Sequence, residues 1–340
     1  MSINPAVVSF PALRSDTLDA FWHFVAERQA IFHRRKAGKP APWTLDPLLN
    51  AHKFTNVYRA ADRVSQYLIR EVIGVGSQEP DELIFRCLLF RIFNLPDTYA
   101  WLRDHLGTTP SLRNWSPSHY ATLINQMQNA GHNTWSGAYI MRTPADYCGQ
   151  GRGAKTAGWL AVLHSMWQHG LFDYIPLEDN LRASVKALQT YPTVGPFLAM
   201  QYATDIGYTT AVTWSENDYI QPGVGALRGA QRLFSRQVAE AHLPALATGL
   251  IGDLTRNQLT AFNERHLEFV AIGATATKHG RGLRLIDVQN CLCEFDKYSR
   301  GRFPAESVGP TRIKQRFEPL IAQTHGPIAY VWPERWNLED

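Results

Sequence analysis

The chain has 340 residues, of which 45% are hydrophobic and 19% are charged, and its 34 basic and 30 acidic side chains leave a net charge of +4. This length allows a substantial hydrophobic core, and the small positive excess permits a nucleic acid partner without requiring one. No apolar run approaches the roughly 20 residues of a membrane-spanning helix, and the first residues show no basic segment followed by an apolar core. We therefore expect a globular protein of the cytoplasm, with no secretory signal and no membrane partner.

The histidines and cysteines lack the spacing of metal ligands. The 12 histidines are scattered along the chain, and no Cys-x-x-Cys pair occurs among Cys87, Cys148, Cys291 and Cys293. We expect reduced thiols and no metal site built from protein ligands.

Apolar residues recur at helical spacing along most of the chain. We expect helices at residues 16–35, 53–63, 82–93, 99–105, 118–128, 159–167, 181–188, 237–246, 257–274 and 285–298. Thr44 or Asp46 can cap the helix that follows them. Strand-like alternation is scarce, so the sequence predicts a mostly α protein. Because no internal repeat or long linker occurs, a single domain is expected over residues 1–310, with a C-terminal tail, 311–340, packed on it.

Residues 149–156, GQGRGAKT, differ from a phosphate-binding P-loop by Ala154, which replaces the glycine before the lysine. A P-loop follows a hydrophobic strand, whereas PADY lies before this segment. We therefore predict a flexible basic loop near DNA phosphates, with Arg152 and Lys155 as candidate contacts. A plain exposed loop is the alternative.

Residues 188–234 contain the pattern that most favours a functional site. Pro and Gly in YPTVGP interrupt two helical runs and predict a helix, a tight turn and a second helix over residues 181–206. Unpaired N–H groups at the start of the second helix suit a phosphate. After it, Asp218 precedes PGVGALRG, a predicted glycine-rich turn that carries Arg228. An acid, a flexible backbone and a cation so close in sequence indicate chemistry beside a phosphate, although a solvated or capping Asp after an ordinary turn gives the same pattern.

The segment YPTVGPFLA resembles the helix-hairpin-helix of DNA glycosylases, whose pattern is LPGVGxxTA. The resemblance implies a glycosylase-like helical fold, contacts of Thr193 and Gly195 with DNA phosphate, and an essential acid at Asp218. Thr193 replaces the first hairpin glycine of the pattern. Phe197 stands where some glycosylases carry a Schiff-base lysine, so lyase chemistry is not implied.

Three further blocks, residues 42–68, 222–229 and 287–300, look like the alpha-glutamyl/putrescinyl thymine pyrophosphorylase family, and the related helical domain of 5-hydroxymethyluracil DNA kinases shares them. Such proteins are associated with phages that hypermodify thymine, which would place this chain in the host cytoplasm. The resemblance implies a transferase that acts on double-stranded DNA and displaces pyrophosphate from 5-pyrophosphoryloxymethyluracil with an amino acid or polyamine. It also implies a 5-hydroxymethyluracil DNA kinase as a functional partner, whereas this chain lacks a sound P-loop for a kinase role of its own.

The implied reaction assigns roles to residues along the chain. Asp218 is expected to accept a proton from the amine or to hold its cation, with Asp296 or Glu294 as the alternative acid. Cations and backbone N–H groups are expected to hold the departing pyrophosphate, and aromatic and amide side chains to hold a flipped base. The expected substrate-binding residues are Trp43, Asn56, Tyr58, Arg59, Arg63, Gly223, Gly225, Arg228, Lys297 and Arg300, and Trp135 is a further candidate for stacking.

Two other functions fit the same residues. A DNA glycosylase would excise a modified pyrimidine and leave abasic sites. A non-catalytic subunit of a kinase system would bind modified DNA without turnover. In either enzyme reading no cofactor is required, although Mg²⁺ could bridge pyrophosphate oxygens with few protein ligands.

Overall fold

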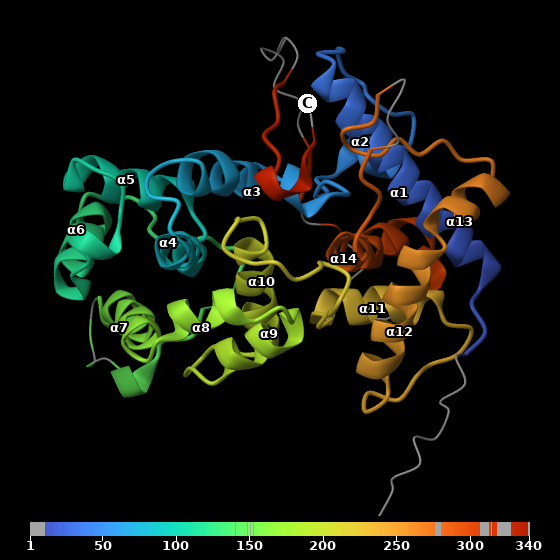
Figure 1. Cartoon of the computed structure of the whole chain (residues 1–340). Coiled ribbons are helices and arrows are strands. Elements are labelled where there is room, and N and C mark those ends of the chain that lie inside the picture. Colours follow the sequence, from blue (N-terminus) through green and yellow to red (C-terminus); the bar gives the residue numbers. More distant parts are fainter. Residues whose placement is uncertain are drawn as a thin grey trace, which may run out of the picture. The chain divides into compact units, whose positions relative to one another are not determined.

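The chain is mostly helical in the computed structural model, which describes residues 11–139, 141–147, 149, 151, 153–275, 280–306, 313, 315–317 and 328–338 (Figure 1). Within these residues extended backbone pairs only in isolated bridges, such as that between Leu13 and Phe234, and forms no β-strand. This confirms the predicted mostly α class, while the helix-hairpin-helix glycosylase type stays a prediction.

The chain divides into two compact units. Unit 1 comprises residues 1–61 and 220–330, and unit 2 comprises residues 62–219 and 331–340. Each unit is therefore built from segments that are distant in sequence. The division does not test the predicted single domain over residues 1–310 with its tail at 311–340, which stays a prediction.

Unit 1 is a helical assembly with an aromatic core. Its elements are α1 (Ser15–Lys36), α2 (Pro47–Ala51), η1 (Arg59–Ala61), α11 (Val224–Leu233), α12 (Leu243–Arg256), α13 (Gln258–Glu264), α14 (Leu285–Arg302) and η5 (Pro304–Glu306). Helices α11, α12 and α14 pack on one another, and α1 packs on α14 (Figure 1). Between α1 and α14, the rings of Phe21 and Phe295 meet edge to face with centroids 5.4 Å apart, and the Phe24 ring lies 5.1 Å from that of Tyr298. Such tilted contacts suit the quadrupoles of aromatic rings.

Two glycines of α11 allow this helix to lie close against α14. Gly225 and Gly229 are four residues apart and therefore share one helix face. A Cβ atom on Gly229 would lie 2.0 Å from the backbone oxygen of Leu292, and one on Gly225 would lie 2.2 Å from Sγ of Cys293. The predicted glycine-rich turn is therefore wrong: of its glycines only Gly223 lies outside the helix, as the N-cap.

Unit 2 is organised around a buried helix, α4 (Pro80–Phe93). Arg86 and Arg91 are tolerated in this apolar helix because their guanidinium groups are bonded internally. Arg86 donates to two backbone oxygens, and Arg91 donates to both carboxylate oxygens of Asp205. The other elements of unit 2 are α3 (Arg63–Tyr67), the π-helix η2 (Leu68–Ile73), α5 (Pro96–Leu106), η3 (Leu112–Asn114), α6 (Pro117–Asn129), η4 (Ala145–Tyr147), α7 (Ala154–Gln168), α8 (Leu171–Leu177), α9 (Leu181–Gln189), α10 (Pro196–Ile206) and η6 (Glu334–Trp336).

The two helices and the tight turn expected over residues 181–206 are present as α9 and α10, which pack together. Thr193 adopts a φ of 64° in the turn between them. This left-handed conformation is costly for a β-branched residue and natural for glycine, the residue that the hairpin pattern has at this position.

Several expected helices differ from the structure. Residues 53–58 are irregular and are followed by the short 3₁₀ helix η1, with α3 beginning only at Arg63. The helix expected at 237–246 begins only at Leu243, with a proline in its first turn. Helices α8 and α11 were not predicted at all.

The helix expected at 257–274 is also wrong in extent. Helix α13 ends at Glu264, and His266 has a φ of 51°. A left-handed residue cannot continue a right-handed helix, so the chain beyond it is irregular. Within the described part of the chain, no helix combines the length and apolar character needed to cross a bilayer.

Candidate functional site

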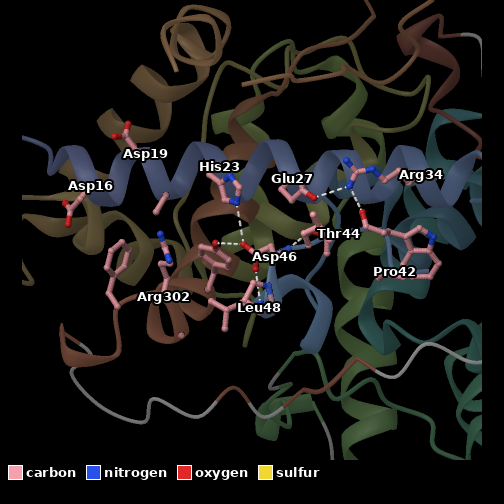
Figure 2. Close-up of a pocket in the computed structure, with 17 residues that line it drawn as sticks. Asp16, Asp19, His23, Glu27, Arg34, Pro42, Thr44, Asp46, Leu48 and Arg302 are labelled. Carbon is pink, nitrogen blue, oxygen red and sulfur yellow. Dashed lines mark hydrogen bonds and ion pairs between the residues drawn. The ribbon is translucent and has the colours of Figure 1, made fainter. Parts of the chain in front are cut away.

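Unit 1 contains a cavity of about 1060 Å³ between α1, the segment of residues 42–48 and the C-terminal end of α14 (Figure 2). Asp16, Asp19, His23 and Glu27 line it from one face of α1, because they recur every three or four residues. The further charged residues of its wall are Arg34, Asp46 and Arg302. The wall therefore carries more carboxylates than guanidinium groups, which favours a cationic ligand.

Asp46 is held in place by the start of α2. Its Oδ1 accepts hydrogen bonds from the backbone N–H groups of Leu48 at 2.9 Å and Leu49 at 3.0 Å, while its own N–H donates to Thr44 Oγ1 at 3.0 Å. Of the two caps that the sequence allowed, Asp46 is therefore the N-cap residue. Pro47, with its fixed φ, begins the helix.

The second oxygen of Asp46 joins the two long helices of the cavity wall (Figure 2). Oδ2 accepts a hydrogen bond of 2.7 Å from the Tyr298 hydroxyl and lies 3.5 Å from Nε2 of His23. The Asp46 side chain is 9% exposed, whereas that of His23 is 49% exposed. A largely covered carboxylate thus contacts an imidazole that is open to the cavity.

This arrangement shifts the pKa of each member of the cluster. Burial would raise the pKa of Asp46, but the bonds from His23, Tyr298 and the two backbone N–H groups outweigh it and lower the pKa to about 2. The Asp46 carboxylate raises the pKa of His23, against the opposing effect of burial. Burial, together with the hydrogen bond to Asp46, raises the pKa of Tyr298. Asp46 is therefore ionised and Tyr298 neutral near pH 7, and His23 is the member able to change its charge.

The other carboxylates of the wall are also positioned by ion pairs. Glu27 lies 3.0 Å from Arg34, and Arg34 also donates to the backbone oxygen of Trp43. Asp19 lies 2.8 Å from Arg265. These ion pairs are partly exposed and therefore weak. They orient the carboxylates but still allow them to bind a ligand.

Trp43 is the predicted substrate-binding residue that lies in this cavity wall. Its indole N–H donates to the backbone oxygen of Lys39 at 2.6 Å, and the guanidinium of Arg35 lies over its ring at 5.1 Å from the centroid. The ring is thereby fixed in orientation.

The predicted residues Asn56, Tyr58 and Arg59 lie in an internal network of unit 1. Asn56 accepts from Arg28 at 2.8 Å through Oδ1 and donates through Nδ2 to a backbone oxygen. Tyr58 is fully buried and donates to the backbone oxygen of Arg281. The backbone N–H of Arg59, which is also buried, donates to the Asp287 carboxylate. Their polar atoms therefore hold the fold together, and the predicted readout of a base stays untested.

The predicted residues of α14 form two ion-pair groups. Asp296 is buried, 3.3 Å from Arg232 and 3.6 Å from Arg300. Lys297 lies 2.6 Å from Glu294 and sits over the ring of Phe54. Both cations and both acids therefore have partners within the protein.

The remaining predicted residues are divided between the units. Arg228 is exposed on α11 in unit 1, whereas Arg63 and Asp218 are exposed in unit 2. Oδ2 of Asp218 accepts a hydrogen bond of 2.9 Å from the backbone N–H of Ser215, so the residue also stabilises a turn.

The predicted DNA contacts belong to unit 2. Thr193 and Gly195 lie in the turn between α9 and α10, and Gly195 is the N-cap of α10. Lys155 lies in the first turn of α7, with its Nζ 4.1 Å from the centroid of the Trp135 ring, and burial lowers its pKa. Arg152 lies outside the described residues.

His23, Asp46 and Tyr298 were not predicted from the sequence as functional residues. One signal for them is the spacing of Asp19, His23 and Glu27, which puts three titratable groups on one face of a single helix. Another is that Asp46 and Tyr298 both lie in the blocks that resemble a known family. For metals, the described residues contain no group of three or more His, Cys, Asp or Glu able to hold an ion.

The fold and the site thus define a helical protein with a carboxylate-lined cavity and a histidine–aspartate–tyrosine cluster in its wall. Residues 15–307 match the family described as the helical domain of 5-hmdU DNA kinase, and the chain belongs to this family. It is 23% identical over 296 residues to a protein named 5-hmdU DNA kinase from Bacillus phage SP10. The alignment covers 82% of this chain and 44% of that relative, so the chain spans less than half of the relative's length. No solved structure matches the chain.

These comparisons confirm the predicted relation to the helical domain of the kinases. The finer assignment to the thymine pyrophosphorylases stays a proposal. The matched residues begin at the first residue of α1 and extend past the end of α14, so they include the whole wall of the cavity.

Proposed function

We propose that the chain is a transferase that acts on 5-hydroxymethyluracil in DNA, and that it displaces pyrophosphate from 5-pyrophosphoryloxymethyluracil with an amine or amino acid. The observation that carries this proposal is the carboxylate-lined cavity of unit 1. An amine donor is a cation at neutral pH. Asp16, Asp19 and Glu27 pair with the partly exposed Arg14, Arg265 and Arg34, and we propose that the donor exchanges with these arginines. The same wall would repel the phosphates of ATP, which argues against a kinase reaction in this cavity.

Membership of the family supports the choice of DNA substrate. The related phage protein is named for a kinase of 5-hmdU in DNA. We infer that the same modified base, in double-stranded DNA, is the substrate here. A kinase of that base is then the functional partner that supplies the phosphorylated form.

Exposed cations are proposed to hold the DNA and the leaving group. Arg63 and Arg228 project from the surface, where each can neutralise phosphate charge. The turn residues Thr193 and Gly195, with Lys155, are proposed to contact the DNA backbone. Arg152 has the same proposed role, and Lys297 and Arg300 are the further candidates for pyrophosphate.

Two acids were predicted for the reaction, Asp218 and Asp296, and both remain proposals. Mg²⁺ is proposed only as a partner of pyrophosphate. Because the described residues offer no cluster of potential ligands, such an ion would take most of its ligands from the pyrophosphate oxygens and water.

Mass spectrometry of nucleosides tests the proposed reaction. DNA that contains 5-pyrophosphoryloxymethyluracil is incubated with the full chain and a mixture of amino acids and polyamines. We expect a new nucleoside with the added mass of one donor, together with release of one pyrophosphate for each base modified. Glu27→Gln should raise the KM for the donor, while Glu264→Gln, which removes an exposed carboxylate outside the cavity, should not.

Other outcomes would select the alternatives. Loss of the modified base with abasic sites would identify a glycosylase, and Asp218→Asn should then abolish them. An unchanged nucleoside profile with retained binding of modified DNA would identify a non-catalytic subunit.

A further inference from the structure

The geometry points to His23 as the general base of the proposed transfer, with Asp46 and Tyr298 as the residues that position it. This inference rests on the proposed function and names the proton acceptor of that same site. It replaces neither the cations proposed for pyrophosphate nor the DNA contacts. It assigns to the cavity a chemical step in addition to binding.

The first argument is that the two ring nitrogens of His23 have different surroundings. Nε2 faces the Asp46 carboxylate at 3.5 Å. A carboxylate on one nitrogen holds the proton of the neutral imidazole there and leaves the other nitrogen, Nδ1, with its lone pair. Within the described part of the chain no group pairs with Nδ1, and the ring is about half exposed in the cavity wall.

The second argument is the number of groups that fix Asp46. One carboxylate receives the N–H groups of Leu48 and Leu49, the hydroxyl of Tyr298 and the contact from His23. These partners come from α1, α2 and α14, so the carboxylate is held from three directions. The hydroxyl of Tyr298 prevents Oδ2 from rotating away from the imidazole, which is the sense in which Tyr298 positions the base.

The reaction needs such an acceptor. The donor binds as an ammonium ion and first loses one proton to water. The resulting neutral primary amine attacks the methylene carbon with its lone pair, and a new C–N bond forms. The C–O bond to pyrophosphate breaks, and its electron pair leaves with the pyrophosphate. The nitrogen then carries one proton too many, and that proton passes to Nδ1 of His23 and later to water. Counted from the neutral amine, the products are the substituted aminomethyl base, pyrophosphate and one proton.

The charges around His23 set its pKa for the role of a general base. Asp46 is the main group that raises its pKa, Glu27 acts in the same direction, and burial and Arg302 act against them. Asp19 lies on the same helix face, and the neutral Tyr298 donates to the same Asp46 oxygen that His23 contacts. A base with a pKa near the operating pH is both unprotonated often enough and basic enough to be efficient.

The two acids predicted from the sequence are less suited to this step. Asp296 is buried and paired with Arg232 and Arg300, so its carboxylate is already neutralised by two cations. Asp218 has one oxygen bound to the backbone of Ser215 and lies on the surface, where water competes for the proton. His23 alone among the three lies in the wall of the cavity that is proposed to bind the amine.

The test compares transfer rates of the wild-type chain, His23→Ala and His33→Ala. His33 lies on the same helix outside the cavity, where its ring contacts the backbone oxygen of Val270, so its replacement controls for perturbation of α1. We expect His23→Ala to lower kcat/KM for transfer by about 100-fold or more and added imidazole to restore part of the rate. His33→Ala should keep the wild-type rate and show no effect of imidazole.

The pH profile tests the positioning residues. The rate of the wild-type chain should rise with pH and then level off, and Asp46→Asn should move the midpoint to lower pH. Asn caps a helix as well as Asp does, but Asp46→Asn also replaces a carboxylate oxygen by an NH₂ group beside Tyr298. Tyr298→Phe therefore serves as the second variant, which keeps the carboxylate and the cap and should move the midpoint in the same direction. A merely structural role would lower stability and leave the midpoint unchanged.

A measurement on the resting protein adds an independent readout. In the chain labelled with ¹⁵N-histidine, with the His23 signals identified from His23→Gln, the neutral ring should carry its proton on Nε2. A proton on Nδ1 would overturn the inference. A wild-type rate of transfer in His23→Ala would contradict only the role of His23 as general base. Absence of transfer by the wild-type chain would contradict both that role and the proposed function.

Discussion

The Tyr298 hydroxyl donates a 2.7 Å hydrogen bond to Oδ2 of Asp46, a contact between residues 252 positions apart in the chain. The donor lies in α14 and the acceptor caps α2, so the bond ties these helices together beside the cavity. The same oxygen faces His23 on α1. The stability of unit 1 and the chemistry of its cavity therefore depend on one carboxylate.

Removing the hydroxyl of Tyr298 should destabilise the protein. A hydrogen bond to a charged group contributes about 1.5 to 3 kcal/mol, so Tyr298→Phe should lower the free energy of unfolding by about that amount. Urea denaturation measures it. Tyr99→Phe is the matched control, because the buried Tyr99 hydroxyl has no hydrogen-bond partner among the described residues. Its removal should leave stability unchanged or raise it, and an equal loss in both variants would contradict the prediction.

The contact between Asp46 and His23 should stabilise the protein in a limited pH range. Asp46 has its pKa lowered from 3.8 to about 2, so its contribution is present above the unfolded value and is lost as the pH falls toward 2. His23 has its pKa raised above 6.5, so its contribution is present below that value and is lost as the pH rises through the folded pKa. The difference in unfolding free energy between the wild-type chain and His23→Gln should therefore be largest between about pH 4 and 6.5. Urea denaturation across pH measures this difference, and a difference independent of pH would count against the ion pair.

Replacing Gly229 by alanine should be strongly destabilising. The new Cβ would meet the backbone oxygen of Leu292 at 2.0 Å, and neither helix can move without loss of packing. We expect a loss of about 1 to 3 kcal/mol or more, measured as a change in the midpoint of urea unfolding. Gly225→Ala should cost less, because the obstacle is the side chain of Cys293.

A control for helix propensity is available on α12. A Cβ on Gly252 would meet only the guanidinium end of Arg256, at 3.1 Å, which can move aside. Gly252→Ala should therefore stabilise the protein by up to about 1 kcal/mol. If Gly229→Ala were also neutral or stabilising, α11 would not lie against α14 as described.

The ion pair of Arg91 and Asp205 should be sensitive to the loss of one partner. Both side chains are buried, at 4% and 0% exposure, so Asp205→Asn leaves a cation in the core without its carboxylate. We expect a loss of about 3 to 5 kcal/mol, and replacing both residues by apolar ones should recover much of it. A double-mutant cycle measures the coupling. The exposed pair of Asp253 and Arg256 is the control, and Asp253→Asn should change stability by less than about 1 kcal/mol.

Predictions that rested on a pattern visible along the chain were more reliable than predictions of features that depend on contacts with distant residues. Helix α14 was predicted because its buried positions recur at a period that the chain itself displays. Helix α11 was read as a turn because its glycines suggest flexibility when seen alone, whereas in the fold they face Leu292 and Cys293. The helix expected past Glu264 failed because the conformation of His266 depends on its surroundings.

The candidate site shows the same contrast. Trp43 was predicted and does line the cavity, whereas Asn56 and Tyr58 have their polar atoms in internal bonds. Nothing in the spacing of these three residues distinguishes a side chain in the cavity wall from one in an internal network. That distinction depends on which element packs over each side chain, and that element comes from residues far away in the sequence.

The sequence by itself determined the mostly α class, the tight turn between α9 and α10, the cap before α2 and the relation to the helical domain of the 5-hmdU DNA kinases. These features depend on local backbone preferences and on patterns that can be read along the chain. Only the tertiary structure brought His23, Asp46 and Tyr298 together and assigned the glycines of α11 to packing. The physical reason is that a hydrogen bond, a burial or a clash is a property of distance in space, and helix packing sets that distance between residues that sequence spacing leaves unrelated.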